Sequence, residues 1–122
     1  MTNDGAVTNA DTTIYHNPRC GTSRTALAAL RDAGIEPTVV KYLETPPSRT
    51  ELAKLLEAAG LAPSEAIRRK EAVYRELELA DATEDQLLDA MAANPILIER
   101  PIVVTAKGTV LARPAERVAD VL

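Results

Sequence analysis

The only cysteine and the only histidine of this chain lie four positions apart, in the segment HNPRCGTSRTAL at residues 16–27. Cys20 is a candidate nucleophile, and His16 is a candidate proton shuttle or a nearby positive charge. The segment follows a β-branched run and precedes a helical pattern. Backbone N–H groups at a helix N-terminus favour a thiolate, and a cysteine pKa there can fall from ~8.5 to about 3.5–7.5. The spacing therefore predicts a reactive thiol at a strand-to-helix turn.

The donors that stabilise a thiolate also bind oxyanions, so this turn can hold a substrate beside its nucleophile. Gly21 lets the backbone approach a ligand closely, and Thr22 is the second expected substrate-binding residue of the loop. Ser23 stands where C-x-x-C motifs have their second cysteine, and it either bonds the thiolate or caps the helix. The alternative is structural: a buried, inert Cys20 and a His16 that bonds a strand-end carbonyl.

Three arginines are candidate anion ligands, because a guanidinium presents a planar fork to a tetrahedral oxyanion. Arg68 lies in IRRKE, whereas Arg100 and Arg113 each precede a proline and flank a predicted terminal hairpin. A residue before proline is held extended, which fixes the direction of its side chain. If the hairpin lies beside the cysteine strand, Arg100 and Arg113 converge on the loop. The alternative is that these arginines are surface residues or partners of nearby glutamates.

The elements that must position these residues follow from periodicity and turn signals. Strands are predicted for TTIYH, PTVVKYL, PIVVT and TVLA, at 12–16, 37–43, 101–105 and 109–112. Helices are predicted after Ser23, after the capping boxes Ser48/Glu51 and Thr83/Gln86, in an interrupted form over 63–80, and from Pro114. The order β-α-β, helices, β-β-α predicts an α/β fold with a mixed sheet, since the first crossover implies parallel pairing.

Composition limits the function classes. The 122 residues suit one domain, and the net charge of −4 argues against a nucleic-acid partner. One cysteine excludes an internal disulfide and a multi-cysteine metal site. No apolar run approaches the ~20 residues of a membrane span, and no secretory signal is visible, so we expect a cytoplasmic protein. We expect a disordered leader at 1–11 and a single domain at 12–122 with a helical insertion at about 45–95.

With these motifs in place, the chain resembles the glutaredoxin-linked arsenate reductases, a thioredoxin-fold family. The segments that carry the resemblance reach from residue 12 to the C-terminus: TIYHNPRCGTSRTAL, YLETPPSR-EL, RRKE to Tyr74, NPILIERPIVVT and G-x-x-LARP. HNPxCGTSR and RPIVV are the most specific. The resemblance implies a thioredoxin-like mixed sheet, and it implies that Pro101 follows a cis peptide bond.

The resemblance also implies an activity, which is the reduction of arsenate to arsenite. Cys20 is then the nucleophile, His16 and Ser23 assist it, and Arg68, Arg100 and Arg113 hold the oxyanion. A single-cysteine protein cannot supply two electrons by closing its own disulfide, so an external thiol is required. In the family this thiol is glutathione, and glutaredoxin resolves the mixed disulfide. No metal, no tightly bound cofactor and no membrane partner is implied, and we expect a monomer.

The chain departs from the family pattern in RRKE, where Lys70 replaces an asparagine and Arg69 replaces a lysine. This leaves Arg69 as an alternative to Arg68. Two other functions stay open: a monothiol, glutathione-dependent oxidoreductase that does not act on arsenate, and an Spx-type regulator that binds RNA polymerase. Such regulators commonly carry C-x-x-C, which this chain lacks.

Overall fold

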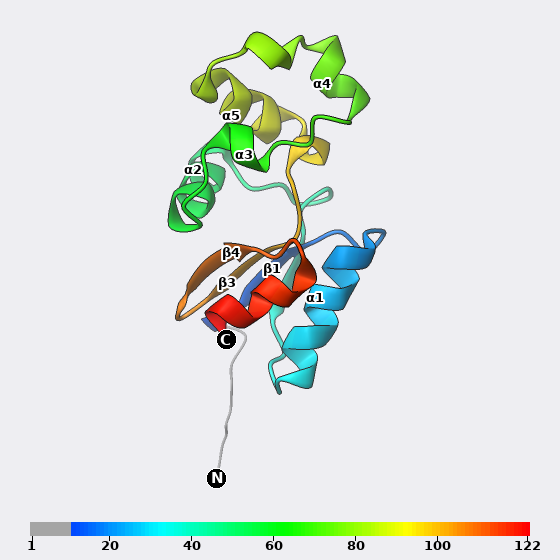
Figure 1. Cartoon of the computed structure of the whole chain (residues 1–122), viewed down its shortest axis with the longest axis vertical. Helices are drawn as coiled ribbons and strands as arrows, with labels where there is room; N and C mark the ends of the chain where they lie inside the picture. Colours follow the sequence, from blue (N-terminus) through cyan, green and yellow to red (C-terminus); the bar gives the residue numbers. More distant parts are fainter. Residues whose placement is uncertain (1–10) are drawn as a thin grey trace. The chain divides into compact units, whose positions relative to one another are not determined.

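The N-terminal strand–helix–strand segment forms as predicted. The computed structural model describes residues 11–122, so residues 1–10 of the predicted leader lie outside the described residues. Strand β1 (Thr13–His16) leads into helix α1 (Gly21–Asp32), which returns the chain to strand β2 (Thr38–Lys41) (Figure 1). β1 and β2 pair in parallel, which requires a crossover connection of this kind.

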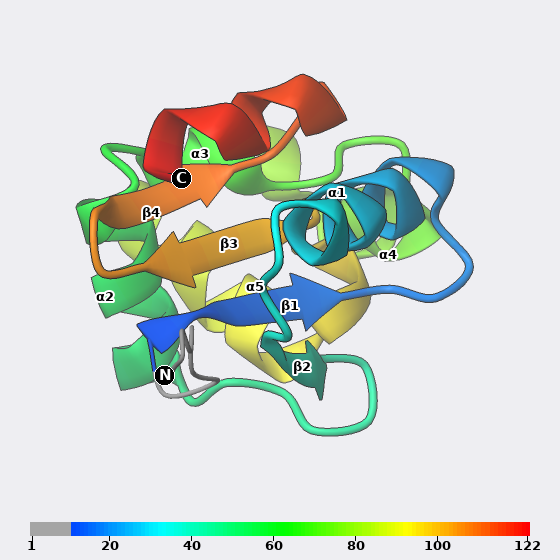
Figure 2. The ribbon, with the colours of Figure 1, turned by 90° about the horizontal axis from the view of Figure 1, so that it is seen from below.

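The predicted terminal hairpin completes the sheet. Strands β3 (Ile102–Thr105) and β4 (Gly108–Leu111) pair antiparallel, and β3 also pairs antiparallel with β1. The strand order is therefore β2-β1-β3-β4, a mixed sheet with one parallel edge (Figure 2). Because β3 adjoins β1, the residues before β3 lie at the same end of the sheet as the residues after β1. This is the end at which the Cys20 loop begins.

Helix α1 and the C-terminal helix η4 (Ala115–Val121) pack on the same face of the sheet. Figure 2 shows α1 in front of the strands and η4, in red, alongside β4. The last helix was predicted to begin at Pro114 as an α-helix. This detail was wrong, because η4 is a 3-10 helix and Pro114 is its N-cap. The buried aliphatic core of this face comprises Ile14, Ala26, Leu30, Val103, Val110, Ala112, Ala115, Val118 and Val121.

In chain order, a helical segment separates β2 from β3, and the starts of its two longest helices were predicted from the sequence. Helices α2 (Arg49–Ala58) and α5 (Glu84–Ala93) both begin with complete capping boxes, at Ser48 with Glu51 and at Thr83 with Gln86. α5 packs against α2 and against the short helix α3 (Pro63–Ala66). The interrupted helical region comprises α3, α4 (Ala72–Glu76) and the 3-10 turn η2 (Leu79–Asp81), and a further 3-10 turn, η3, spans Pro95–Leu97.

The chain divides by its internal contacts into two compact units. The sheet unit comprises residues 11–41 and 100–122 of the described chain, and the helical unit comprises residues 42–99. The helical insertion predicted at about 45–95 falls inside the helical unit, while the single-domain organisation over 12–122 stays a prediction. None of the helices within residues 11–122 is long and apolar enough to cross a membrane.

Candidate active site

Cys20 occupies the N-cap of α1, with its backbone extended. Its N–H donates to the Asn17 carbonyl at 3.0 Å, and its carbonyl accepts from the Arg24 N–H at 2.9 Å. The prediction that Ser23 caps this helix was wrong, because the helix begins at Gly21, two residues earlier. Cys20 takes the cap position without a side-chain cap bond, so no cap side chain satisfies the free N–H groups of the first turn.

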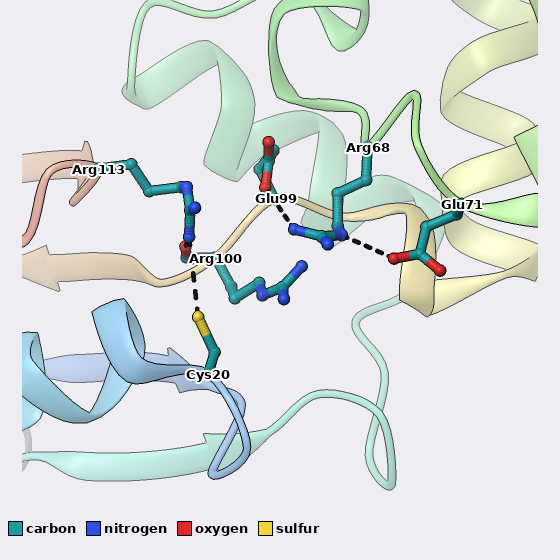
Figure 3. A network of polar contacts seen from close by, with 6 residues as sticks. All are labelled: Cys20, Arg68, Glu71, Glu99, Arg100 and Arg113. Atoms are coloured by element: carbon teal, nitrogen blue, oxygen red, sulfur yellow. Dashed lines mark hydrogen bonds and ion pairs between the residues drawn. The ribbon is translucent and has the colours of Figure 1, made fainter.

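The Cys20 thiol is held by positively charged groups. Arg113 Nη1 lies 3.7 Å from the sulfur, and Figure 3 shows the guanidinium directed at it. Burial raises the pKa of the thiol. The N–H of Ser23 and the guanidiniums of Arg100 and Arg113 outweigh burial and lower the pKa to about 7. Cys20 is buried, as the structural alternative expected, but roughly half of it is thiolate at neutral pH, so the thiol is not inert.

Arg100 and Arg113 converge on the loop from the two ends of the hairpin. Arg113 Nη1 also donates to the Arg100 carbonyl at 2.9 Å, which ties the Arg113 side chain to the Arg100 backbone. Each arginine precedes a proline through a cis peptide bond; the bond at Pro101 was expected and the bond at Pro114 was not. Within residues 11–122, the buried Arg100 Nε has no hydrogen-bond partner. A buried donor of this kind calls for an acceptor such as an oxyanion.

His16 and Ser23 form a buried pair behind the thiol. His16 Nδ1 and Ser23 Oγ are 2.6 Å apart, and Ser23 Oγ accepts the Asn17 N–H at 3.1 Å. Burial lowers the pKa of His16, and Arg31, Lys41 and Arg24 lower it further. Both effects favour the neutral imidazole and disfavour the interpretation that His16 adds positive charge to the loop. Ser23 serves the thiolate through its N–H, while its hydroxyl binds His16 and Asn17.

Arg68 belongs to the helical unit, where two carboxylates hold it. Its Nε donates to Glu71 at 3.0 Å and its Nη1 donates to Glu99 at 3.1 Å (Figure 3). Burial lowers the pKa of Arg68, but the two carboxylates outweigh it and raise the pKa. The alternative, Arg69, is exposed and donates to the Ser64 carbonyl at 2.8 Å.

The sheet unit thus brings together the loop residues and two of the three arginines that the sequence predicted: His16, Cys20, Gly21, Thr22, Ser23, Arg100 and Arg113. The alternative that an arginine pairs with nearby glutamates is confirmed for Arg68, although the sequence did not identify Glu71 and Glu99 as the partners. The i,i+3 spacing of Arg68 and Glu71 was a usable signal. Glu99 is 31 positions away from Arg68, and nothing local to either residue indicates their contact.

Comparison with known proteins agrees with this geometry. The model of the ArsC family matches residues 15–121. An arsenate reductase of Rhizobium meliloti (strain 1021) is 57% identical over 112 residues, which are 90% of this chain and 80% of the relative. An arsenate reductase of Escherichia coli is 56% identical over 90% of this chain and 79% of the relative. The uncharacterized protein YfgD of Escherichia coli (strain K12) is 46% identical over 89% of this chain and 94% of the relative.

Solved structures give the same result. A putative arsenate reductase from Yersinia pestis is 52% identical, with a TM-score of 0.84 over 90% of this chain and 99% of the other. An arsenate reductase from Vibrio cholerae is 47% identical, with a TM-score of 0.85 over 91% of this chain and 97% of the other. These likenesses confirm the thioredoxin-like α/β fold and the family inferred from the HNPRCGTSR loop and the RPIVV segment. The chain belongs to the ArsC family.

Proposed function

We propose that this chain reduces arsenate to arsenite, with Cys20 as the nucleophile and a small external thiol as the reductant. The observation that carries this proposal is the Cys20 thiol itself, with a pKa of about 7 and contacts to Arg100 and Arg113. A nucleophile that is half ionised at neutral pH beside two guanidiniums suits attack on an anionic substrate. The arsenate reductases among its relatives support the choice of arsenate.

In the first step the Cys20 thiolate attacks arsenic. A sulfur–arsenic bond forms, and one arsenic–oxygen bond breaks, with the oxygen leaving as water after it takes up protons. Arg100 and Arg113 spread the charge of the oxyanion over fixed donors, which stabilises the transition state without reorganisation. The buried Nε of Arg100 supplies one such donor in the described chain. Gly21 and Thr22, the first residues of α1, add N–H groups at its N-terminus.

In the second step an external thiolate attacks the Cys20 sulfur. The electron pair of the sulfur–arsenic bond goes to arsenic, which passes from the pentavalent to the trivalent state, and a mixed disulfide remains on Cys20. A further thiol must reduce that disulfide, because the chain has no second cysteine. Glutathione fits the first role and glutaredoxin the second. Both operate in the cytoplasm, where thiols are kept reduced, and the protein works there.

Arg68 is the third oxyanion ligand in this proposal. Its support is the match of IRRKE to the family's first arginine, together with its partial burial and the two carboxylates that raise its pKa and keep it positively charged. Arg69 is the weaker candidate because its guanidinium is exposed, whereas that of Arg68 is partly buried. His16 and Ser23 hold the loop and its hydrogen bonds in place and do not contribute charge.

A coupled assay tests the function. The purified protein is incubated with arsenate, glutathione, glutaredoxin and a recycling system, and the loss of NADPH is followed. We expect arsenate-dependent oxidation that Cys20→Ser abolishes. A wild-type protein that oxidises no NADPH in response to arsenate, although it is folded and its thiol is free, would overturn the proposal.

The second candidate is a glutathione-dependent oxidoreductase that does not act on arsenate. The observation in its favour is the lone cysteine, Cys20, because its partly ionised thiol does not by itself specify arsenate as the substrate. The same assay separates the two functions. A mixed-disulfide substrate would then be turned over by wild type and not by Cys20→Ser, while arsenate would have no effect.

A further inference from the structure

The two carboxylates on Arg68 are absent from the mechanism above. Glu71 and Glu99 bond different nitrogens of one guanidinium, Nε and Nη1, at 3.0 and 3.1 Å. The three side chains are between 20% and 26% exposed, so solvent screens these ion pairs less than it screens pairs on the open surface. The charges of this Glu71–Arg68–Glu99 cluster, +1 and two of −1, sum to −1. If Arg68 binds an oxyanion, the net negative charge of its own cluster should repel that oxyanion, so the two carboxylates must have another effect on binding.

The backbone fixes this cluster. Residues 67 and 98 form an antiparallel bridge, the Arg68 N–H donates to the Leu97 carbonyl at 2.8 Å, and the Glu99 N–H donates to the Ala66 carbonyl at 2.8 Å. These bonds place Glu99 beside the guanidinium of Arg68, where it accepts from Nη1. Glu71 reaches Nε from the turn that follows Arg68. The carboxylates are thus a built feature of the helical unit and not a chance contact of flexible surface chains.

The two carboxylates have different positions relative to an incoming anion. A guanidinium has five N–H donors, and the described contacts use the one on Nε and one on Nη1. An oxyanion that binds the Nη1 and Nη2 tip therefore lies next to Glu99. Glu71 bonds Nε, on the side of the guanidinium away from an oxyanion bound at this tip. An ionised carboxylate only accepts hydrogen bonds.

We propose that Glu99 selects oxyanions that carry a proton. This inference rests on the proposed function, because it takes Arg68 as an oxyanion ligand. Hydrogen arsenate and hydrogen phosphate keep at least one O–H at neutral pH, and that O–H can donate to Glu99 while the other oxygens accept from Arg68. Sulfate has no proton, so its oxygens meet the carboxylate with like charge and no hydrogen bond. Discrimination arises from this repulsive element as well as from the attraction of the guanidinium. Glu71 is a positioning residue that orients Arg68.

Competitive inhibition of arsenate reduction measures the selectivity. Inorganic phosphate and sulfate are the probes, and the ratio of their inhibition constants at pH 7 is the readout. We expect wild type to bind phosphate at least about tenfold more tightly than sulfate, which corresponds to about 1.4 kcal/mol. Glu99→Gln should bring the ratio to within about threefold of one, because an amide N–H donates to sulfate. The rise in melting temperature with the concentration of each anion gives its affinity, and hence the same ratio, without turnover.

Two matched variants separate selectivity from other effects. Glu71→Gln removes the same charge from the same guanidinium, and it should change both inhibition constants together while leaving their ratio as in wild type. Glu57→Gln, on the exposed surface of α2, should change neither. A Glu99→Gln protein that is folded and still prefers phosphate as wild type does would overturn the proposal, and so would equal binding of the two anions by wild type.

A last variant distinguishes this inference from the proposed function. Arg68→Gln should raise the inhibition constants of both anions by at least about tenfold. If Arg68→Gln leaves them unchanged while arsenate reduction continues, Arg68 is not an oxyanion ligand and the Glu99 inference is wrong, although the function of Cys20 stands. If wild type reduces no arsenate, the proposed function itself fails, and the melting-temperature ratio alone then decides the selectivity of Glu99.

Discussion

Replacing Arg113 by glutamine should raise the pKa of Cys20. In the native protein burial raises the pKa of Cys20, but the Ser23 N–H, Arg100 and Arg113 together outweigh burial and lower the pKa to about 7. Arg113 supplies both a positive charge and the 3.7 Å contact to the sulfur. Since the three donors share the stabilisation of the thiolate, losing Arg113 should raise the pKa of Cys20 to about 8. This corresponds to about 1.4 kcal/mol less stabilisation of the thiolate relative to the thiol.

The expected change in reactivity follows from that magnitude. At pH 7 about half of the native thiol is ionised, whereas a pKa one unit higher leaves about a tenth ionised, so alkylation at pH 7 should slow about fivefold. Above about pH 10 the two proteins should react at equal rates. The single cysteine makes the assay simple, because iodoacetamide uptake by mass spectrometry reports on Cys20 alone.

The control is Arg24→Gln. Arg24 is an exposed cation of the same helix, and its Nη1 donates to the Pro18 carbonyl instead of the sulfur. This variant should alkylate like wild type across the pH range. If Arg113→Gln keeps the native pH profile, or if Arg24→Gln shifts it as far, the contact with Arg113 is not what ionises Cys20, and the electrostatic reasoning fails.

Three further substitutions test other parts of the structure. Arg100→Lys keeps the charge but loses the planar fork and the Nε donor, so kcat/KM for arsenate should fall at least tenfold, about 1.4 kcal/mol or more, in the coupled assay. Ser23→Ala leaves the Asn17 N–H and His16 Nδ1 without their partner, and it should lower the free energy of unfolding by about 1–3 kcal/mol in urea while the thiol pKa stays near 7, since the backbone N–H remains. Leu30→Ala opens a cavity in the fully buried core of the sheet unit and should cost about 2–5 kcal/mol of unfolding free energy.

Much of the fold was predictable because its signals are local. The capping boxes at Ser48 and Thr83 involve residues three positions apart, and both helices begin where those boxes indicate. The N-terminal crossover and the terminal hairpin follow from short β-branched runs and their connections. The errors were local as well. Serine is a common N-cap residue, but the Ser23 hydroxyl bonds His16 inside the helix, and the N-cap is Cys20.

The candidate site was predictable where scarcity and chain order limited the choices. A lone cysteine before a helix, and arginines at both ends of a hairpin that pairs with the cysteine strand, point to one end of the sheet. What could not be predicted depends on tertiary contacts. The lowered pKa of His16 reflects its burial and three cations from α1 and β2. The contact between Arg68 and Glu99 depends on the bridge between Ile67 and Ile98.

Protection of Cys20 by arsenate against alkylation reports whether the thiolate lies in an oxyanion-binding site. Alkylation of wild-type Cys20 at pH 7, without added thiol, should slow in a saturable way as arsenate is added, because the oxyanion binds against the sulfur and its arginines. The Arg100→Lys protein should require at least about tenfold more arsenate for the same protection. If saturating arsenate leaves the alkylation rate of the wild-type thiol unchanged, the thiolate does not face an oxyanion site, and the proposed chemistry is wrong.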